Sequence, residues 1–427
     1  MDFETGGARD FCPKKMNSVR PVIEYLYYIT IPVRMRLWYV AARICWRIFD
    51  IRRRKITNLG KDGARRLLFV AKYPLSLFFV CHQVELMKGD PNLTFYITSP
   101  RKTRNMCRRE IDRMGVEARY VDLWDALTSD WDLISFPHHC LGALFHPSIP
   151  KIFTAHGLEN GKKILRDTAY TYSWKAILKD HQSYYTRFLA TSPNEFNIAG
   201  ADKYGRAFTN KIVVTSQALA LKLLEENRYR EKIRSDFGLK SNTRKAVLIM
   251  STWGEESLLR TIGPAIIDRA VSLNTKYRFF VFAHAHNFRN KKGLKIVNAI
   301  KAKGMEVIDP GPSSWIPYAV AADLAISDKT SLSLYFSLLH KPIMFTQIGE
   351  EEFVGGSPFM KLYNVSPKLL APEDLGEQIE KCLRSDYSGR VKVFAEQTFP
   401  RIDQKDHLKS AIYECMRSPY PQGFQPS

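Results

Sequence analysis

Histidine, hydroxyl and glycine residues gather in four short segments, each of which directly follows a run of apolar residues. The first segment is 154–163, TAHGLENGKK. His156 could act as a general base near neutral pH, and Gly157 would let the backbone approach a ligand closely. Lys162 could bind an anion. The alternative is a loop histidine without a chemical role, which is the commoner case for a lone histidine.

The second and third segments, 250–257 and 282–288, combine hydroxyl groups, a glycine and two histidines. Thr252 precedes an expected helix, so it could help to bind an anion or simply cap that helix. His284 and His286 are two residues apart and could ligate a metal ion, but no third ligand is evident nearby. Either histidine could instead donate a hydrogen bond to a phosphate oxygen.

The fourth segment is 325–333, AISDKTSLS, in which an expected strand ends and an expected helix begins. The hydroxyls of Thr330 and Ser331, together with the free amides of the helix start, could cradle a phosphate. Asp328 could cap the helix, or could bind a ribose or a histidine. A simple Ser/Thr cap without any ligand is the alternative.

Short apolar strands alternate with helices through most of the chain, and these elements must position the four segments. Strands are expected at 67–71, 93–98, 118–121, 133–136, 151–154, 246–250, 278–283, 307–308, 324–327 and 343–346. Helices are expected at 77–87, 101–114, 256–272, 291–303, 315–322 and 331–339, and the connecting region 195–242 is expected to be mostly helical. Such alternation indicates two doubly wound halves with parallel sheets. Ligands bind beyond the carboxyl ends of parallel strands, so the cleft between the halves is the expected site.

Composition limits the classes of partner. The chain has 427 residues, with 64 Lys and Arg against 43 Asp and Glu, a net charge of +21. This balance favours anionic partners, namely nucleic acid, phosphorylated small molecules or an anionic membrane. Nucleic acid is disfavoured because no binding motif with interleaved aromatic residues is recognisable. The seven cysteines include no CxxC pair, which argues against a structural metal site and a disulfide framework and fits a reducing compartment.

The N-terminal residues 1–60 are expected to form a membrane-association segment. They hold twelve Lys or Arg and five Asp or Glu. On a helical wheel, residues 35–54 place Arg36, Arg43 and Arg47 in one polar stripe, while apolar residues cover most of the remaining surface. This pattern is typical of a helix that lies in the membrane interface. A helix packed on the protein's own core, with its arginines in water, is the alternative.

No apolar run reaches 18 residues, and the N-terminus lacks the pattern of a secretory signal peptide, so neither a membrane-spanning helix nor secretion is expected.

Residues 315–345, WIPYAVAADLAISDKTSLSLYFSLLHKPIMF, resemble the hallmark of the CDP-glycerol glycerophosphotransferases of teichoic-acid synthesis. In that family a helix is followed by "aD-L-I-T-D-Y-S-S", a second helix and "K-P-I-x-F". The matching positions are Asp323, Asp328, Thr330, Ser331, Lys341 and Pro342. Three shorter matches precede it in the family's order: His156-Gly157 with Lys162 or Lys163 is similar to "H-G-T-x-x-K", residues 250–254 to "P-T-W-R", and His286-Asn287 to "H-P".

The resemblance implies a GT-B fold, in which two Rossmann-like domains face each other across a cleft. It also implies a peripheral enzyme at the cytoplasmic face of the membrane that needs no tightly bound metal or cofactor. Such a transferase moves a glycerol-phosphate or similar polyol-phosphate unit from a CDP-activated donor to a lipid-linked acceptor in cell-surface polymer synthesis. The implied domains are 1–60 for membrane association, 61–215 for the acceptor, 216–400 for the donor, and 401–427 as a C-terminal helix and tail.

The resemblance also implies roles for individual residues. His156 would deprotonate the acceptor hydroxyl, while His286, Thr330 and Ser331 would bind the donor pyrophosphate. The candidate catalytic residues are therefore His156 and His286, and the candidate donor- or phosphate-binding residues are Gly157, Lys162, Thr252, Asp328, Thr330 and Ser331.

Three positions depart from the family pattern. Gly254 stands where the family usually has Arg, Asn287 replaces Pro, and Tyr335 stands where an Asp usually follows the helix start. The donor therefore stays open among CDP-glycerol, CDP-ribitol and a nucleotide sugar. The alternative function is a GT-B nucleotide-sugar glycosyltransferase of capsule or lipopolysaccharide synthesis.

Overall fold

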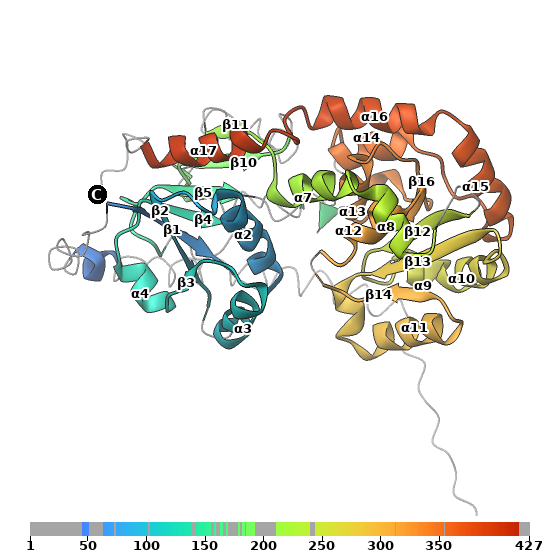
Figure 1. Cartoon of the computed structure of the whole chain (residues 1–427), viewed down its shortest axis with the longest axis horizontal. Coiled ribbons are helices and arrows are strands. Elements are labelled where there is room, and N and C mark those ends of the chain that lie inside the picture. The colour runs from blue at the N-terminus through green and yellow to red at the C-terminus, as the bar shows by residue number, and fades with distance from the viewer. Residues whose placement is uncertain are drawn as a thin grey trace, which may run out of the picture.

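The computed structural model describes two α/β domains that lie side by side (Figure 1). The described residues are 45–50, 63–71, 74–100, 103–137, 142, 144–154, 158, 163–164, 168–169, 178–179, 182–183, 185–192, 211–239, 244–311, 313–353 and 355–417. Three predicted site residues, His156, Gly157 and Lys162, lie outside these ranges, and so does most of the predicted membrane segment.

The first domain is built on a seven-stranded sheet whose order is β11-β10-β5-β4-β1-β2-β3, with every neighbouring pair parallel. The strands are β1 (Arg65–Val70), β2 (Leu93–Thr98), β3 (Arg119–Tyr120), β4 (Leu133–Phe136), β5 (Lys151–Thr154), β10 (Arg187–Ala190) and β11 (Ile212–Val214). Alternate residues of β1 enter two different apolar clusters, Leu67 one and Leu68 the other, because helices or loops cover both faces. The helices include α2 (Pro74–Met87), α3 (Arg104–Met114) and α4 (Leu123–Thr128).

The second domain is built on a five-stranded parallel sheet of order β14-β13-β12-β15-β16. Its strands are β12 (Lys245–Ser251), β13 (Tyr277–Ala283), β14 (Glu306–Ile308), β15 (Leu324–Ser327) and β16 (Ile343–Phe345). Its helices are α9 (Leu258–Thr261), α10 (Gly263–Ser272), η3 (Ala285–Phe288), α11 (Lys291–Ala302), α12 (Ile316–Ala321), α13 (Leu332–Ser337), η4 (Glu350–Glu352), α14 (Pro358–Val365), α15 (Leu375–Arg384) and α16 (Tyr387–Thr398). Val247 and Leu248 of β12 point into opposite apolar clusters, so this sheet is also buried on both faces.

Two connections join the domains. Helices α7 (Ala218–Asn227) and α8 (Arg230–Asp236) lead from the first sheet to the second. The last described helix, α17 (Lys405–Arg417), returns to the first domain, where Leu408 and Ile412 join the same apolar cluster as Leu67 (Figure 1). The Tyr413 hydroxyl also donates a hydrogen bond to Asp90 of the first domain. The C-terminal helix is therefore part of the first domain's packing.

The predicted fold class is confirmed, with two parallel sheets flanked by helices. The structure differs from the prediction in two places. The helix expected over 256–272 is divided into α9 and α10, because Pro264 lacks an amide N–H and fits only in the first turn of a helix. Strands β10 and β11 were not predicted, and β11 lies in the connecting region that was expected to be helical.

The described turn of the predicted membrane helix, residues 45–50, packs against the first domain. The side chain of Phe49 is 0% exposed and stacks on His146 with ring centroids 4.6 Å apart. The Trp46 indole N–H donates to the carbonyl of Phe145 at 3.1 Å, and Cys45 is buried in the same cluster. The prediction that this apolar face enters a membrane is therefore wrong for Cys45 and Phe49, since the protein's own core covers them. None of the described helices has the length and apolarity needed to cross a bilayer.

Replacement of Phe49 by alanine should destabilise the first domain by about 3–5 kcal/mol, because it leaves a cavity in a filled core. Unfolding in urea, followed by fluorescence, would measure the change. Arg47→Ala, an exposed position on the same turn, should stay within about 0.5 kcal/mol of the parent. Equal stability of the two variants would show that Phe49 lies off the core.

Candidate functional site

Three of the four predicted segments meet at the carboxyl edge of the second sheet. In the strand register Ser251 of β12 lies opposite Ala283 of β13, and Met250 lies opposite Ser327 of β15. The loops that carry Thr252, His286 and Asp328 therefore begin at neighbouring positions along one edge, as expected for a parallel sheet.

The carboxylate of Asp328 fixes the loop that follows β12. Its side chain is 1% exposed and accepts hydrogen bonds from the Thr252 amide at 2.9 Å, the Ser251 hydroxyl at 2.9 Å and the Leu258 amide at 2.8 Å. Leu258 begins α9, so Asp328 caps this helix from a different loop. Of the roles that the sequence left open for Asp328, the structure displays a cap. A direct contact with a donor stays a prediction.

Lys329 ties a further pair of loops to the same edge. Its ammonium group donates to Glu256 at 2.9 Å and to Glu352 of η4. Burial opposes the charge, but the hydrogen bonds to the two carboxylates outweigh burial and raise the pKa of Lys329. The cation is therefore neutralised by protein groups and acts as a clamp between the β12, β15 and β16 loops.

Thr330 and Ser331 lie at the start of α13, as predicted. Ser331 is the residue before the helix, and its hydroxyl makes no capping hydrogen bond. The buried Thr330 hydroxyl accepts from the Leu332 amide at 3.4 Å, a long contact. Behind them, the Ser333 hydroxyl donates to the Thr330 carbonyl at 2.9 Å and lies 2.7 Å from the Ser327 hydroxyl. A simple serine cap therefore does not explain Ser331.

His286 lies in η3, and its backbone is held on both sides. Its amide donates to Nδ1 of His284 at 3.1 Å, and its carbonyl accepts from the Asn290 side chain at 2.6 Å. The imidazole is exposed and lies 5.0 Å, between ring centroids, from the exposed indole of Trp253. His284 thus uses its ring to position His286, and among the described residues no three His, Cys, Asp or Glu side chains form a metal-binding group.

At two of the three positions that depart from the family pattern, the surrounding structure disfavours the residue that the family usually has. Gly254 has φ of +108°, a conformation that L side chains rarely adopt, so an arginine there would be strained. Tyr335 is buried against Trp315, and its hydroxyl donates to the Gln217 side chain at 2.7 Å. An aspartate at Tyr335 would be too short for both contacts.

Two other residues of the resemblance act on the opposite, amino edge of the sheet. Asp323 accepts from the Ala246 amide at 2.8 Å and pairs with Arg230 at 2.7 Å and with Arg234 at 3.1 Å, which links α8 to the sheet. Lys341 donates to the last carbonyls of α12, and burial lowers its pKa well below the ordinary value. Both side chains are therefore structural.

The segment around His156 is described at three residues, Thr154, Leu158 and Lys163, the last of which begins the short strand β6 (Lys163–Ile164). Thr154 ends β5, and Leu158 is buried in the apolar cluster of the second domain beside Leu219 of α7. The chain thus passes from the carboxyl end of a first-domain strand to the second domain over four residues. The positions of His156, Gly157 and Lys162 stay predictions.

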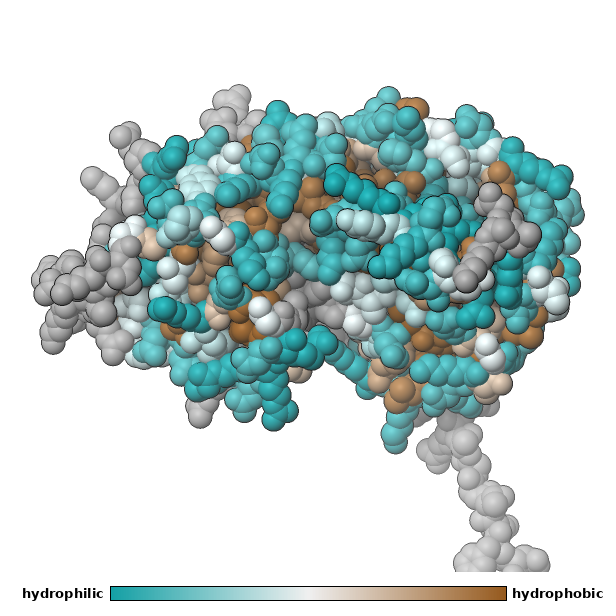
Figure 2. Space-filling view, viewed as in Figure 1, coloured by the Kyte–Doolittle hydropathy of each residue, from teal (hydrophilic) through white to brown (hydrophobic). Residues whose placement is uncertain are grey.

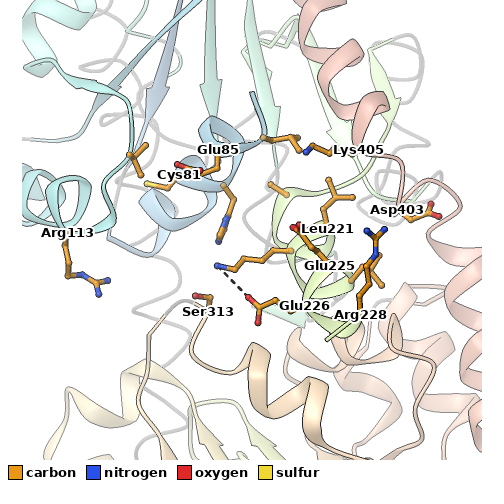
Figure 3. Close-up of a pocket in the computed structure, with 16 residues that line it drawn as sticks. Cys81, Glu85, Arg113, Leu221, Glu225, Glu226, Arg228, Ser313, Asp403 and Lys405 are labelled. Carbon is orange, nitrogen blue, oxygen red and sulfur yellow. Dashed lines mark ion pairs between the residues drawn. The ribbon is translucent and has the colours of Figure 1, made fainter. Parts of the chain in front are cut away.

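A cavity of 860 Å³ separates the two domains near their connection (Figure 3). Its walls come mainly from α2, α3 and α7, with Ser313 in the loop after β14 and with Asp403 and Lys405 at the start of α17. Lys222 and Glu226 of α7 form an ion pair of 3.9 Å in this cavity. Burial, followed by the nearby Lys222 ammonium, lowers the pKa of His82 to about 4, so this imidazole is neutral at pH 7. The described lining includes none of the carboxyl-edge residues, so the cavity is a separate feature.

Comparison with known proteins reveals the fold but no sequence relative. No protein-family model matches the sequence, and no curated protein matches it significantly. A solved structure of the wall teichoic acid polymerase TagF aligns with a TM-score of 0.59 and 14% identity over 94% of this chain and 98% of that chain. The chain has the fold of TagF. A TagF crystal soaked with CDPG aligns with a TM-score of 0.57 and 15% identity over the same shares.

Nucleotide-sugar enzymes share the same GT-B architecture. The UDP-GlcNAc 2-epimerase of Neisseria meningitidis bound to UDP-GlcNAc aligns with a TM-score of 0.53 and 14% identity over 82% of this chain and 99% of that chain. Anabaena HepE in complex with UDP and glucose aligns with a TM-score of 0.50 and 12% identity over the same shares. At these identities the likeness to TagF and to these enzymes establishes the fold.

Three residues that shape the carboxyl edge were given no role by the sequence. Lys329 lies inside a segment that the sequence singled out, but its two carboxylate partners, Glu256 and Glu352, are distant in sequence. Asn287 is buried and donates to the Thr252 carbonyl at 3.4 Å. Trp253 lies two residues after the end of β12 and is exposed, and an exposed tryptophan so close to a strand end is the signal that could have identified it.

Replacement of Asp328 by asparagine should leave a backbone N–H without an acceptor, because the new side-chain NH2 group is itself a donor and cannot accept that hydrogen bond. We expect a loss of about 1–3 kcal/mol in the stability of the second domain, measured by thermal or urea unfolding. Asp268→Asn, which alters an exposed carboxylate paired with Lys303, should change stability by less than about 0.5 kcal/mol. Unchanged stability of Asp328→Asn would contradict the anchoring role.

Proposed function

We propose that the chain is a transferase that moves a glycerol-phosphate or similar polyol-phosphate unit from a CDP-activated donor to a lipid-linked acceptor in cell-surface polymer synthesis. The observation that carries the proposal is the carboxyl edge of the second sheet, where His286 and the hydroxyls of Thr330 and Ser331 occupy neighbouring loops. The fold shared with TagF, one crystal of which was soaked with CDPG, supports the same chemistry.

The proposed reaction is a phosphoryl transfer. The acceptor hydroxyl attacks the glycerol-bearing phosphorus, a new P–O bond forms, and the phosphoanhydride bond breaks so that CMP leaves with the electron pair. His156 accepts the proton of the hydroxyl. Negative charge grows on the leaving phosphate, and donors fixed in advance at Thr330, Ser331 and His286 stabilise it.

The supporting residues have distinct tasks in this proposal. Asp328 positions Thr252 at the edge, and Gly157 and Lys162 complete the phosphate contacts from the first domain. The reaction needs no resident cofactor. The enzyme works as a peripheral protein at an anionic, cytoplasmic membrane surface, where its lipid-linked acceptor is found.

A nucleotide-sugar glycosyltransferase of capsule or lipopolysaccharide synthesis is the second candidate. Gly254 favours it, because the family's arginine is replaced by a residue whose backbone conformation disfavours any side chain. HepE, crystallised with UDP and glucose, supplies a fold precedent. Thermal shifts with CDP-glycerol, CDP-ribitol and UDP-sugars would separate the donors, and the product would contain a phosphodiester or a glycosidic bond accordingly.

Replacing Thr330 and Ser331 together by alanine should weaken binding of CDP-glycerol by about 1–3 kcal/mol, because phosphate oxygens lose two donors. Isothermal titration would measure the affinity, and fold stability should change less. The matched control is Ser385→Ala with Ser388→Ala, two exposed serines at the junction of α15 and α16. Wild-type affinity in the Thr330/Ser331 variant would place the phosphate cradle elsewhere.

Replacing the two histidines should impair different steps of the reaction. His156→Ala should lower kcat by about 100- to 10,000-fold, because the general base is lost, while CDP-glycerol still binds. His286→Ala should weaken donor binding as well as turnover. Steady-state kinetics together with titration would distinguish them. A His156→Ala enzyme that keeps more than about a tenth of wild-type turnover would rule out the base role.

A further inference from the structure

Exposed cations and exposed apolar side chains occur together on one side of the molecule. Helices α3 and α11, from different domains, both lie along the lower edge in Figure 1, and α4 lies beside α3 on the same edge. A flat surface placed beneath this edge would meet both domains at once. Figure 2 shows mostly hydrophilic residues here, with apolar patches among them. We call this side, formed by α3, α4 and α11, the basic face.

Helix α11 supplies most of the charge. It contains no acidic residue, and its buried side is apolar. Five lysines are exposed on it or at its end: Lys291, Lys292, Lys295, Lys301 and Lys303. Lys292 pairs with Glu255 at 3.6 Å, and Lys303 pairs with Asp268. Within the part of the chain that the structure describes, the other three lysines form no ion pair.

The first domain contributes a mixed part of the basic face. Arg108 and Arg109 of α3 are exposed, with Asp112 on the same helix. Arg104 pairs with Asp122 at 3.0 Å, and this ion pair fixes the start of α4 against α3. The excess of positive charge therefore lies on α11, while α3 and α4 extend the face across the first domain.

Large apolar side chains project from the same three helices. Met106 of α3 is 47% exposed, Trp124 of α4 is 48% exposed, and Leu294 of α11 is 39% exposed. A soluble phosphate polymer or a nucleic acid would be attracted by the lysines but would gain little from Met106, Trp124 and Leu294. A bilayer would interact with both kinds of side chain, because its anionic head groups attract lysines while tryptophan and aliphatic side chains enter the interface.

We infer that the basic face docks the protein on an anionic lipid bilayer and that both domains contact the membrane at once. This inference deepens the proposed function, because it rests on an acceptor that is linked to lipid. It also assigns the membrane contact to a folded surface, after residues 45 and 49 of the predicted N-terminal helix were found in the core. In this orientation the lipid of the acceptor would lie in the bilayer, beneath the basic face of the two domains.

Vesicle co-sedimentation of the full chain tests the inference. The protein should bind phosphatidylcholine vesicles that contain anionic phosphatidylglycerol, and bind pure phosphatidylcholine far more weakly. The triple variant Lys291→Glu, Lys295→Glu, Lys301→Glu should bind anionic vesicles at least about a hundredfold more weakly, since each lysine contributes roughly a fivefold effect. These side chains are exposed, and circular dichroism would verify that the fold is kept.

The matched control reverses three exposed cations on α15 and α16, away from the basic face: Lys381→Glu, Arg384→Glu and Lys392→Glu. It should retain most of the binding. Equal losses in the two triple variants would reduce the effect to net charge and overturn the inference. Parent-like binding of the α11 variant would overturn it too.

A second pair of variants tests whether the partner is a bilayer. Trp124→Ala should weaken vesicle binding several-fold, whereas Tyr229→Ala, which removes another exposed aromatic ring, should not. If Trp124→Ala binds like the parent while the lysines matter, the basic face binds a phosphate polymer or a nucleic acid instead. Binding of CDP-glycerol in solution should be normal in all these variants. Absence of that binding in the parent would refute the proposed donor and leave the vesicle result to decide the docking inference.

Discussion

An ionised carboxylate in a protein interior loses its hydration and is stable only where hydrogen-bond donors replace the lost water. Asp328 meets this requirement with the hydroxyl of Ser251, the last residue of β12, and with two backbone amides of the segment that follows the strand. That segment cannot move away without leaving the charge unpaired. The relative positions of the β12 and β15 loops, which carry most of the described candidate site, therefore depend on this one group.

The two aspartates of the stretch Asp323–Asp328 act as a pair at opposite ends of β15. Asp323 accepts from the amide of Ala246 near the start of β12, and Asp328 accepts from the amide of Thr252 just after its end. The central strand pair is thus fastened at both ends by side chains. Asp323 also binds two arginines of α8, so the same short motif links the site to the helix that enters the domain.

The sequence predicted the sheets well because each central strand is an uninterrupted apolar run bounded by polar residues. The strands Leu93–Thr98, Leu133–Phe136, Lys151–Thr154 and Leu324–Ser327 agree with the structure at both ends. It also identified the loops of the candidate site, since parallel strands bring their carboxyl ends together. The helix at 45–50 shows the limit: an amphipathic pattern describes the apolar face but not what covers it. Likewise, the partners of Lys329 and Asp328 come from loops distant in sequence, and only the tertiary fold reveals such pairs.

The return of α17 to the first domain has a consequence for biosynthesis. A chain that emerges from the ribosome N-terminus first can form the second domain's core from Leu158 and residues within 219–402, but the first domain must wait for Leu408 and Ile412. Until then, the apolar groove that α17 will fill lies open, although its sheet is already complete. The earlier half of the chain thus finishes folding last, and chaperones would be needed most during that interval.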